Sequence, residues 1–273
     1  DADSVLRHVD LYCEDGRIRA IGPDLAVQAD EVLDGSHLLC YPGLINTHHH
    51  LYQQFSRNLP EVQNLELFPW LKALYEIWKN LDTEVVHASS LTGMGELMKN
   101  GCTTCFDHHY VFPAGCGDLL GAQFAAADEL GMRMVASRGS MDLSVKDGGL
   151  PPDSVVQSVD AILEDSAALI ERWHDPSYGS MRQIALAPCS PFSVSRELLL
   201  QSAKLARQYH VRLHTHLAET KDEERFVRER CGMRPLEYME SLGWIGPDVW
   251  YAHGIHFNGE ELRRLAETGT GVA

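Results

Sequence analysis

The 273-residue sequence lacks several features that would place it in a particular class. It has no stretch of about 20 uninterrupted apolar residues, and its first residues, DADSVLRHVD, are acidic where a secretory signal would be basic and then apolar. It also has no Lys/Arg-rich run, and 39 acidic against 23 basic residues give a formal net charge of -16. We therefore expect no nucleic-acid or membrane partner, and a cytoplasmic protein.

A disulfide framework is not indicated either. The seven cysteines are an odd number scattered through a long chain, which is typical of reduced thiols. Cys102 and Cys105 form a C-x-x-C pattern in GCTTCFDHH, which could indicate a zinc or redox pair. Because no second pair completes a four-cysteine site and the segment has strand character, we interpret these cysteines as buried packing.

Three catalytic signatures are missing as well. The segment after the first long strand-like run, NTHHHLYQ, contains no glycine, so it cannot be the Gly-rich turn of a doubly wound nucleotide fold. The H-x-E and P-C-x-x-C patterns of cytidine-type deaminases do not occur, and neither does the G-x-S-x-G elbow of serine hydrolases. These absences exclude a serine nucleophile and the cytidine-type zinc site.

The sequence does contain two different patterns of predicted secondary structure. Residues 1–42 consist of short strand-like pieces joined by turn residues, VDLYC, RIRAIG, EVLDG and HLLCYPG, which predict part of a small β-sandwich domain. Residues 43–273 alternate apolar runs with helical segments whose ends are marked by Asp82 and Thr83 as caps, Gly101 as a stop, Gly131 after LLGAQFAAADEL, and Pro151-Pro152 opening DSVVQSVDAILEDSAALIERW. The runs are LINTHHH, CTTCFDHH, MRMVASRG, RQIALAPCS, VRLHTHLAE and DVWYAHGIH, with TGVA beginning a seventh.

Strands that alternate with helices imply parallel pairing, either in an α/β barrel or in a doubly wound sheet. In a barrel the reactive residues lie at the carboxyl ends of several strands. Nine of the fourteen histidines lie at or just beyond the ends of four runs (48, 49, 50, 108, 109, 214, 216, 253 and 256). The sequence therefore predicts a (β/α)8 barrel of the TIM type over residues 43–273.

The histidine triplet suggests how a site at the barrel mouth would begin. Successive side chains of a strand point to opposite faces, so His48 and His50 can converge while His49 looks away. The same spacing puts His214 and His216 on one face. Solvated histidines at a strand end, or core histidines satisfied by backbone partners, are the alternative explanations.

A carboxylate and a further histidine belong to the same strand ends. Glu219 follows His216 by three residues, and His253 ends the sixth run. Four strand ends directed at one mouth favour a metal site, because a metal needs several neutral imidazoles together and a nearby carboxylate to move protons.

The motifs PGLINTHHH, HTHLAET and YAHGIH together resemble the amidohydrolase superfamily, and within it the metal-dependent aminohydrolases of purines, pyrimidines and triazines. The finer pattern HHHLYQ, LFPWLKALYEIW and CTTCFDHHYVFP is most similar to members that deaminate 8-oxoguanine. The resemblance covers residues 1–273. It implies hydrolytic deamination of a free purine-type base, 8-oxoguanine to urate and ammonia. The alternatives are a triazine (hydroxyatrazine-type) substrate, an adenosine-type substrate, or a catalytically inactive metal-binding fragment.

The resemblance also implies roles for individual residues. His48, His50 and His216 would bind one divalent metal, Zn2+ in the first instance, and His253 would be a further ligand or a hydrogen-bond partner of the reacting water. Glu219 would carry a proton from that water to a ring nitrogen.

Contacts with a small-molecule nucleobase follow from side-chain chemistry alone. Gln53 offers an amide for a purine edge, Trp70 a stacking face, and Arg138 a donor fork toward a carbonyl oxygen. Packing of Trp70 in a helix core is an equal alternative, because LFPWLKALYEIW is amphipathic at helical spacing. The sequence leaves the oligomeric state open, a homo-oligomer included.

Six complete runs and the start of a seventh predict a barrel that is incomplete in this chain. The family has a metal-binding aspartate after its eighth strand, a position beyond residue 273. We therefore expect a first barrel strand without its closing neighbour.

Overall fold

The computed structural model describes residues 5–273, and contacts within it divide the chain between Pro42 and Gly43 into two compact units. In the first unit, β1 (Asp10–Glu14) and β2 (Arg17–Gly22) pair as an antiparallel hairpin. Asp15 and Gly16 form its two-residue turn with φ values of 51° and 69°, the geometry that Asp-Gly favours in hairpins. The small antiparallel sheet that the sequence predicts is present.

Residues 23–43 form no strand, so the strands expected in EVLDG and HLLCYPG are wrong. A strand is stable only where its backbone groups pair with a neighbour, and the only strand pairing described in this unit is that of β1 with β2. The assignment of residues 1–42 to a partial β-sandwich domain stays a prediction.

The second unit contains a curled parallel sheet of seven strands whose spatial order follows the chain, from β3 to β9. A doubly wound sheet would reverse its strand order at a switch point, so the sequential order is that of a barrel. The predicted incomplete (β/α)8 fold is confirmed. The strands are β3 (Leu44–Asn46), β4 (Cys102–Asp107), β5 (Arg133–Ser140), β6 (Arg182–Pro188), β7 (Arg212–Leu217), β8 (Val249–His253) and β9 (Gly271–Val272).

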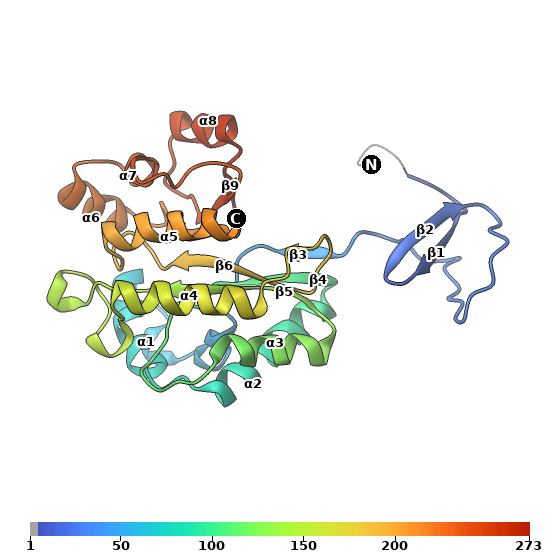
Figure 1. Ribbon diagram of the computed structural model, residues 1–273, viewed down its shortest axis with the longest axis horizontal. Helices are drawn as coiled ribbons and strands as arrows, with labels where there is room; N and C mark the ends of the chain where they lie inside the picture. Colours follow the sequence, from blue (N-terminus) through green and yellow to red (C-terminus); the bar gives the residue numbers. More distant parts are fainter. Residues whose placement is uncertain (1–4) are drawn as a thin grey trace. The chain divides into compact units, whose positions relative to one another are not determined.

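Helices lie between successive strands and cover the outer face of the sheet, where α3 packs on β5 and α4 and α5 pack on β6 (Figure 1). The α-helices are α1 (Leu67–Trp78), α2 (Thr83–Lys99), α3 (Leu119–Leu130), α4 (Val159–Trp173), α5 (Arg196–Tyr209), α6 (Lys221–Cys231), α7 (Pro235–Ser241) and α8 (Gly259–Thr268). Four short 3-10 helices are η1 (Leu51–Ser56), η2 (Pro60–Val62), η3 (Val145–Asp147) and η4 (Asp153–Val155).

The predicted helix boundaries hold where a capping residue is clear. Asp82 accepts a hydrogen bond from the Val85 N–H at the start of α2, and Gly131 ends α3 with φ 68°. The boundary expected at Pro151-Pro152 is wrong, because α4 begins only at Val159. Ser158 is the residue that caps it, since its hydroxyl accepts from the Ala161 N–H.

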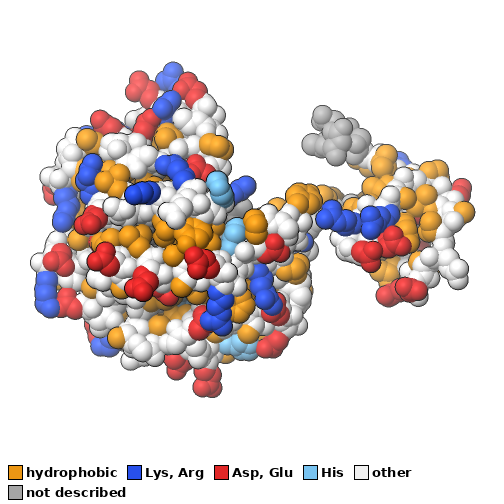
Figure 2. Space-filling model, in the orientation of Figure 1, with side chains coloured by type: hydrophobic (Ala, Val, Ile, Leu, Met, Phe, Trp, Pro, Cys, Tyr) orange, Lys and Arg blue, Asp and Glu red, His pale blue; other side chains and the backbone are white. Residues whose placement is uncertain are grey.

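The core between sheet and helices is apolar, with Phe124 of α3 and Leu198 of α5 fully buried. Cys102 and Cys105 are buried free thiols in this core, as the packing interpretation expects. No helix among the described residues is long and apolar enough to cross a membrane. On the face shown in Figure 2, acidic and basic side chains are interspersed.

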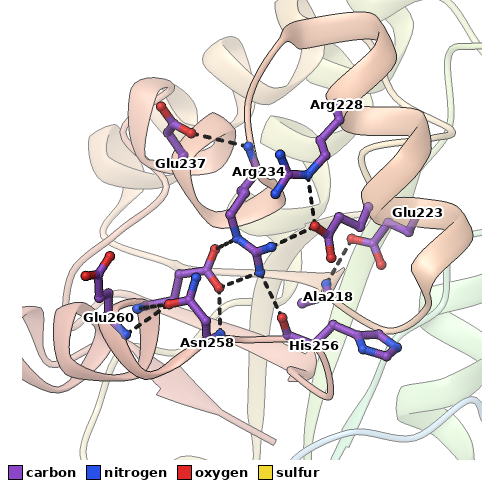
Figure 3. Close-up of polar contacts among 10 residues, drawn as sticks. Ala218, Glu223, Arg228, Arg234, Glu237, His256, Asn258 and Glu260 are labelled. Atoms are coloured by element: carbon purple, nitrogen blue, oxygen red, sulfur yellow. Dashed lines mark hydrogen bonds and ion pairs between the residues drawn. The ribbon is translucent and has the colours of Figure 1, made fainter.

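An ion-pair network joins α6, α7 and α8 through Arg234 (Figure 3). Its guanidinium makes two hydrogen bonds to Glu261, at 2.7 and 2.9 Å, and one to Glu224 at 2.7 Å. It also donates to the carbonyl oxygen of His256 at 2.9 Å. Because the side chains of Arg234 and Glu261 are only 24% and 11% exposed, this pair is shielded from solvent more than an ordinary surface ion pair.

We expect Arg234→Met to lower the free energy of unfolding by about 2 kcal/mol at neutral pH, because Glu261 loses its charged donor. Burial raises the pKa of Glu261, but hydrogen bonds from Arg234 and the Asn258 N–H outweigh it, so this pKa lies below its usual 4.5. A depressed carboxylate pKa contributes stability that is present above the usual value and is lost as pH falls through the folded value.

The difference between wild type and Arg234→Met should therefore shrink as the solution is acidified below pH 4.5, the usual Glu261 pKa. Urea unfolding at neutral and acidic pH measures this. Arg228→Met is the matched control, because Arg228 binds the same Glu224 from a position 52% exposed and should cost at most about 0.5 kcal/mol. Equal losses for the two variants would contradict the network's role.

Candidate active site

Polar side chains collect at the carboxyl ends of β3, β4, β7 and β8, where a barrel places its chemistry. The segment after β3 is held against the segment after β4 by backbone contacts. The His108 N–H donates to the carbonyl of His49 at 2.7 Å, and the His50 ring contacts the carbonyl of His108 at 2.7 Å. The first two strand ends therefore form one surface.

Four imidazoles converge there: His48, His50, His108 and His216. One ring nitrogen from each lies within 4.8 Å of those of the other three. His216 is 6% exposed and His108 is fully buried. The sequence predicted three of these four side chains as partners at one point.

The hydrogen bonds of His50 and His216 fix which ring nitrogens carry protons. Nδ1 of His50 faces the His108 carbonyl at 2.7 Å, and Nδ1 of His216 faces the Cys189 carbonyl at 2.7 Å. A carbonyl oxygen only accepts, so both Nδ1 atoms donate and both Nε2 atoms keep lone pairs. These two Nε2 atoms lie 3.1 Å apart. Two lone pairs that face each other at this distance repel unless a cation lies between them.

The other two rings also direct a lone pair inward. Nδ1 of His214 donates to the Trp250 carbonyl, so its Nε2 can accept from Nδ1 of His48 at 2.9 Å. This leaves Nε2 of His48 as an acceptor. Nε2 of His108 donates to the Ala187 carbonyl at 2.9 Å, which leaves its Nδ1 as an acceptor. Neither His48 Nε2 nor His108 Nδ1 has a hydrogen-bond partner among the described residues.

Burial keeps these imidazoles neutral. It lowers the pKa of His50 and of His214 to about 3, and it lowers the pKa values of His48, His108 and His216 as well. A neutral imidazole is the form that binds a metal ion. A buried set of neutral nitrogens with inward lone pairs fits a divalent cation such as Zn2+, which takes imidazole nitrogens at about 2.0–2.1 Å.

Glu219 and His253 lie beside the histidine cluster. The His253 ring stacks on the His216 ring, with centroids 5.3 Å apart and an interplanar angle of 14°. Its Nε2 lies 3.6 Å from a carboxylate oxygen of Glu219. Burial raises the pKa of Glu219 to about 7 and lowers the pKa of His253, so the two are not an ion pair at neutral pH. Glu219 can both accept and release a proton near neutrality.

A cavity of about 410 Å³ opens onto the cluster. Gln53 of η1 and Trp70 of α1 line it, as do Glu219 and His253. Trp70 also packs against the core, so it combines the two roles that the sequence left open, a face in the cavity and packing of the helix core. Tyr110 and Phe192 add aromatic surface, and Gln54 and Arg57 are polar lining residues that the sequence did not suggest.

The ring of His49 is not one of the four that converge, although the residue contributes to the cavity wall, and its orientation away from the cluster stays a prediction. The predicted role of Arg138 needs correction. Arg138 does not line the cavity. Its guanidinium is buried under α4, where it pairs with Asp165 at 2.5 Å and Gln157 at 2.8 Å and lies 3.9 Å from the centre of the Phe112 ring. This side of β5 faces the helices, so Arg138 cannot serve as the predicted donor to a substrate.

The sequence did not assign roles to two histidines of the site or to the buried carboxylate of Asp107, which precedes His108 in the chain. His108 is a member of the cluster, and His214 orients His48 from behind. Asp107 is buried, and its carboxylate accepts from the Leu51 N–H and from Gln123, both at 2.5 Å. Burial raises the pKa of Asp107 to about 7. The pattern DHH at the end of β4 was the available signal for His108.

Residues 39–273 match the amidohydrolase family. The chain is 50% identical over 265 residues to 8-oxoguanine deaminase of Pseudomonas aeruginosa, covering 96% of this chain and 59% of the relative. It is 41% identical to hydroxydechloroatrazine ethylaminohydrolase of Pseudomonas sp. strain ADP, covering all of this chain and 59% of the relative. The crystal structure of atrazine chlorohydrolase from Arthrobacter aurescens complexed with zinc superimposes with a TM-score of 0.92 at 31% identity, covering 97% of this chain and 60% of that one.

This chain belongs to the amidohydrolase family. It spans about 59% of the length of these two curated relatives. Those relatives and that crystal structure are named for hydrolysis or deamination of small molecules.

Proposed function

We propose that the protein is a metal-dependent hydrolase of C–N bonds that removes an exocyclic amine from a free purine-type base. The observation that carries this proposal is the set of four neutral imidazoles, two of them buried and two half-buried, with inward lone pairs next to a carboxylate whose pKa is raised to about 7. Such a set suits one divalent cation and a proton carrier, the two requirements for hydrolysis by water.

His48, His50 and His216 would hold the cation, and the Nδ1 of His108 is a further nitrogen of the cluster without a hydrogen-bond partner among the described residues. A divalent cation in this place supplies Lewis-acid activation of water at neutral pH. Zn2+ is our choice of metal, because imidazole nitrogens suit it and a structural relative is described as a zinc complex.

Glu219 takes a proton from the attacking water and delivers it to the ring nitrogen beside the amine-bearing carbon. The water oxygen bonds to that carbon, and Glu219, again a carboxylate, then passes the remaining proton of the new hydroxyl group to the amine. The C–N bond breaks, the carbonyl forms, and the amine leaves as ammonia. His253, 3.6 Å from Glu219, either hydrogen-bonds the reacting water or acts as a further ligand. Gln53 and Trp70 contact the edge and the face of the base from the cavity wall.

We propose 8-oxoguanine as the substrate, with urate and ammonia as products, on the strength of the 50% identity to 8-oxoguanine deaminase. The cytoplasmic location and a homo-oligomeric state stay predictions.

Measurement of ammonia release from 8-oxoguanine, guanine, isoguanine, hydroxyatrazine and 5'-deoxyadenosine tests which substrate the protein takes. We expect 8-oxoguanine to give the largest kcat/KM, with urate as product. Turnover of hydroxyatrazine and of no oxopurine would transfer the assignment to a triazine, as the 41% identity to the ethylaminohydrolase would then suggest. Turnover of an adenosine-type compound alone would favour the 5'-deoxyadenosine deaminases, at 31% identity. If none of these compounds releases ammonia, the result would favour an inactive metal-binding chain.

A further inference from the structure

The turn that follows β7 has an unusual backbone. Ala218, between Leu217 of the strand and Glu219, has φ 55° and is 2% exposed. The left-handed region is sparsely occupied by residues other than glycine, asparagine and aspartate, so an alanine stays there only when its surroundings hold it. What holds Ala218 also fixes the direction in which the Glu219 side chain leaves the backbone.

The carboxylate of Glu223 holds this turn from the side of α6 (Figure 3). One oxygen accepts from the Ala218 N–H at 2.9 Å and the other from the Glu219 N–H at 2.8 Å. Glu223 is fully buried. Both of its oxygens are therefore used to hold the two backbone N–H groups that precede the α6 cap.

These hydrogen bonds differ from ordinary helix capping. Thr220 is the N-cap of α6, and its hydroxyl already accepts from the Glu223 N–H at 3.2 Å. In a capping box, a glutamate three residues after the N-cap would reach back to the N–H of the cap residue itself. Glu223 instead binds the two residues before the cap, which lie in the turn and not in the helix.

The turn after β8 holds the same backbone from the other side. The His256 N–H donates to the Ala218 carbonyl at 2.9 Å, and the Gly254 N–H donates to the Leu217 carbonyl at 3.0 Å. Arg234, in turn, donates to the His256 carbonyl at 2.9 Å. The two turns that carry Glu219 and His253 are thus hydrogen-bonded to each other, with Glu223 behind one and Arg234 behind the other.

We propose that Glu223 is a positioning residue, which holds the Leu217–Glu219 turn so that the Glu219 carboxylate faces the histidine cluster. This inference rests on the proposed function, in which Glu219 carries the proton. Glu223 does not line the cavity, so it acts through Glu219 and not on the substrate.

Glu223→Gln is the informative substitution, because a glutamine amide has one acceptor oxygen and turns an NH2 group toward the second backbone N–H. We expect kcat to fall on the order of 10²-fold, the effect of a small misplacement of a reacting group, while KM changes by less than about threefold. Metal content should stay as in wild type. Glu229→Gln, the same change at an exposed position of α6, is the control and should leave all three unchanged.

A double-mutant cycle with Glu219→Gln separates positioning from general destabilisation. If Glu223 acts through Glu219, then Glu223→Gln should lower kcat by less than about threefold in the Glu219→Gln background. An equal loss in both backgrounds, wild-type kcat in the single variant, or a loss of bound metal would overturn the inference. If Glu223→Gln does not fold, Glu223→Asp takes its place, with an intermediate loss expected because the carboxylate is kept but shortened. Wild-type turnover of Glu219→Gln alone would instead contradict the proposed function.

Discussion

We expect Glu219→Gln to bind metal as the wild-type protein does and to lose turnover by about 10² to 10⁴-fold. The amide keeps the shape of the side chain but cannot accept a proton from water and release it to a ring nitrogen. The carboxyl group that it replaces has its pKa raised to about 7 by burial, close to the value at which one group can serve both steps.

Steady-state ammonia release and metal analysis on the same preparation measure this effect, with Glu229→Gln as the control for a lost surface carboxylate. A parallel loss of metal would mean that Glu219 supports the cluster and not the proton transfer. Turnover close to wild type would mean that another group carries the proton, and His253, 3.6 Å away, would be the next residue to replace.

The alternation of strands and helices could be predicted because each element carries its own signals. Asp82 begins α2 through a local hydrogen bond, and Gly131 ends α3 through its backbone geometry, and both depend only on neighbours in the sequence. The start of α4 was placed too early because proline is favoured in the first turn of a helix, so Pro151-Pro152 indicated a helix start. The residue that caps the helix, Ser158, lies several positions later.

The core of the candidate site could be predicted for a similar reason. The spacing of two residues predicts that His48 and His50 share a side, and both rings join the cluster although β3 ends at Asn46 and they lie beyond it. His108 could not be assigned, because its free Nδ1 depends on a hydrogen bond from Nε2 to Ala187, which is 79 residues away. The partners of a ring nitrogen across a barrel are set by tertiary structure.

The predicted contact of Arg138 with a substrate was wrong for a different reason. Its neighbours in MVASRGS are small or apolar on both sides, so the sequence contains no alternation that tells the inner face of β5 from the outer one. The outer face holds it because Asp165 of α4 offers a carboxylate, which contacts its guanidinium nitrogen at 2.5 Å. Burial of a guanidinium requires such a partner, and only the fold shows where the partner lies.

Replacement of the adjacent residues His49 and His50 should have very different effects on metal binding. We expect His50→Ala to remove nearly all bound metal, because the cluster then loses the Nε2 that faces the Nε2 of His216 at 3.1 Å. His49→Ala should keep the metal, because the His49 ring is not among the four that converge. The affinity loss for His50→Ala should exceed the ~10–100-fold that follows from removing an outer partner of a ligand, for which His214→Leu is the comparison.

Metal content after dialysis and competition with a chelator give the Kd of each variant, and thermal unfolding gives a readout that does not depend on activity. A ligand that binds only the folded state raises Tm as its concentration exceeds Kd. Added Zn2+ should therefore raise Tm for wild type and His49→Ala, less for His214→Leu, and hardly at all for His50→Ala. If His49→Ala loses the metal and His50→Ala keeps it, the assignment is wrong, and His49 is the ligand in place of His50. Because the His50 ring is held by the His108 carbonyl at 2.7 Å, that outcome would require the segment after β3 to turn over as a whole.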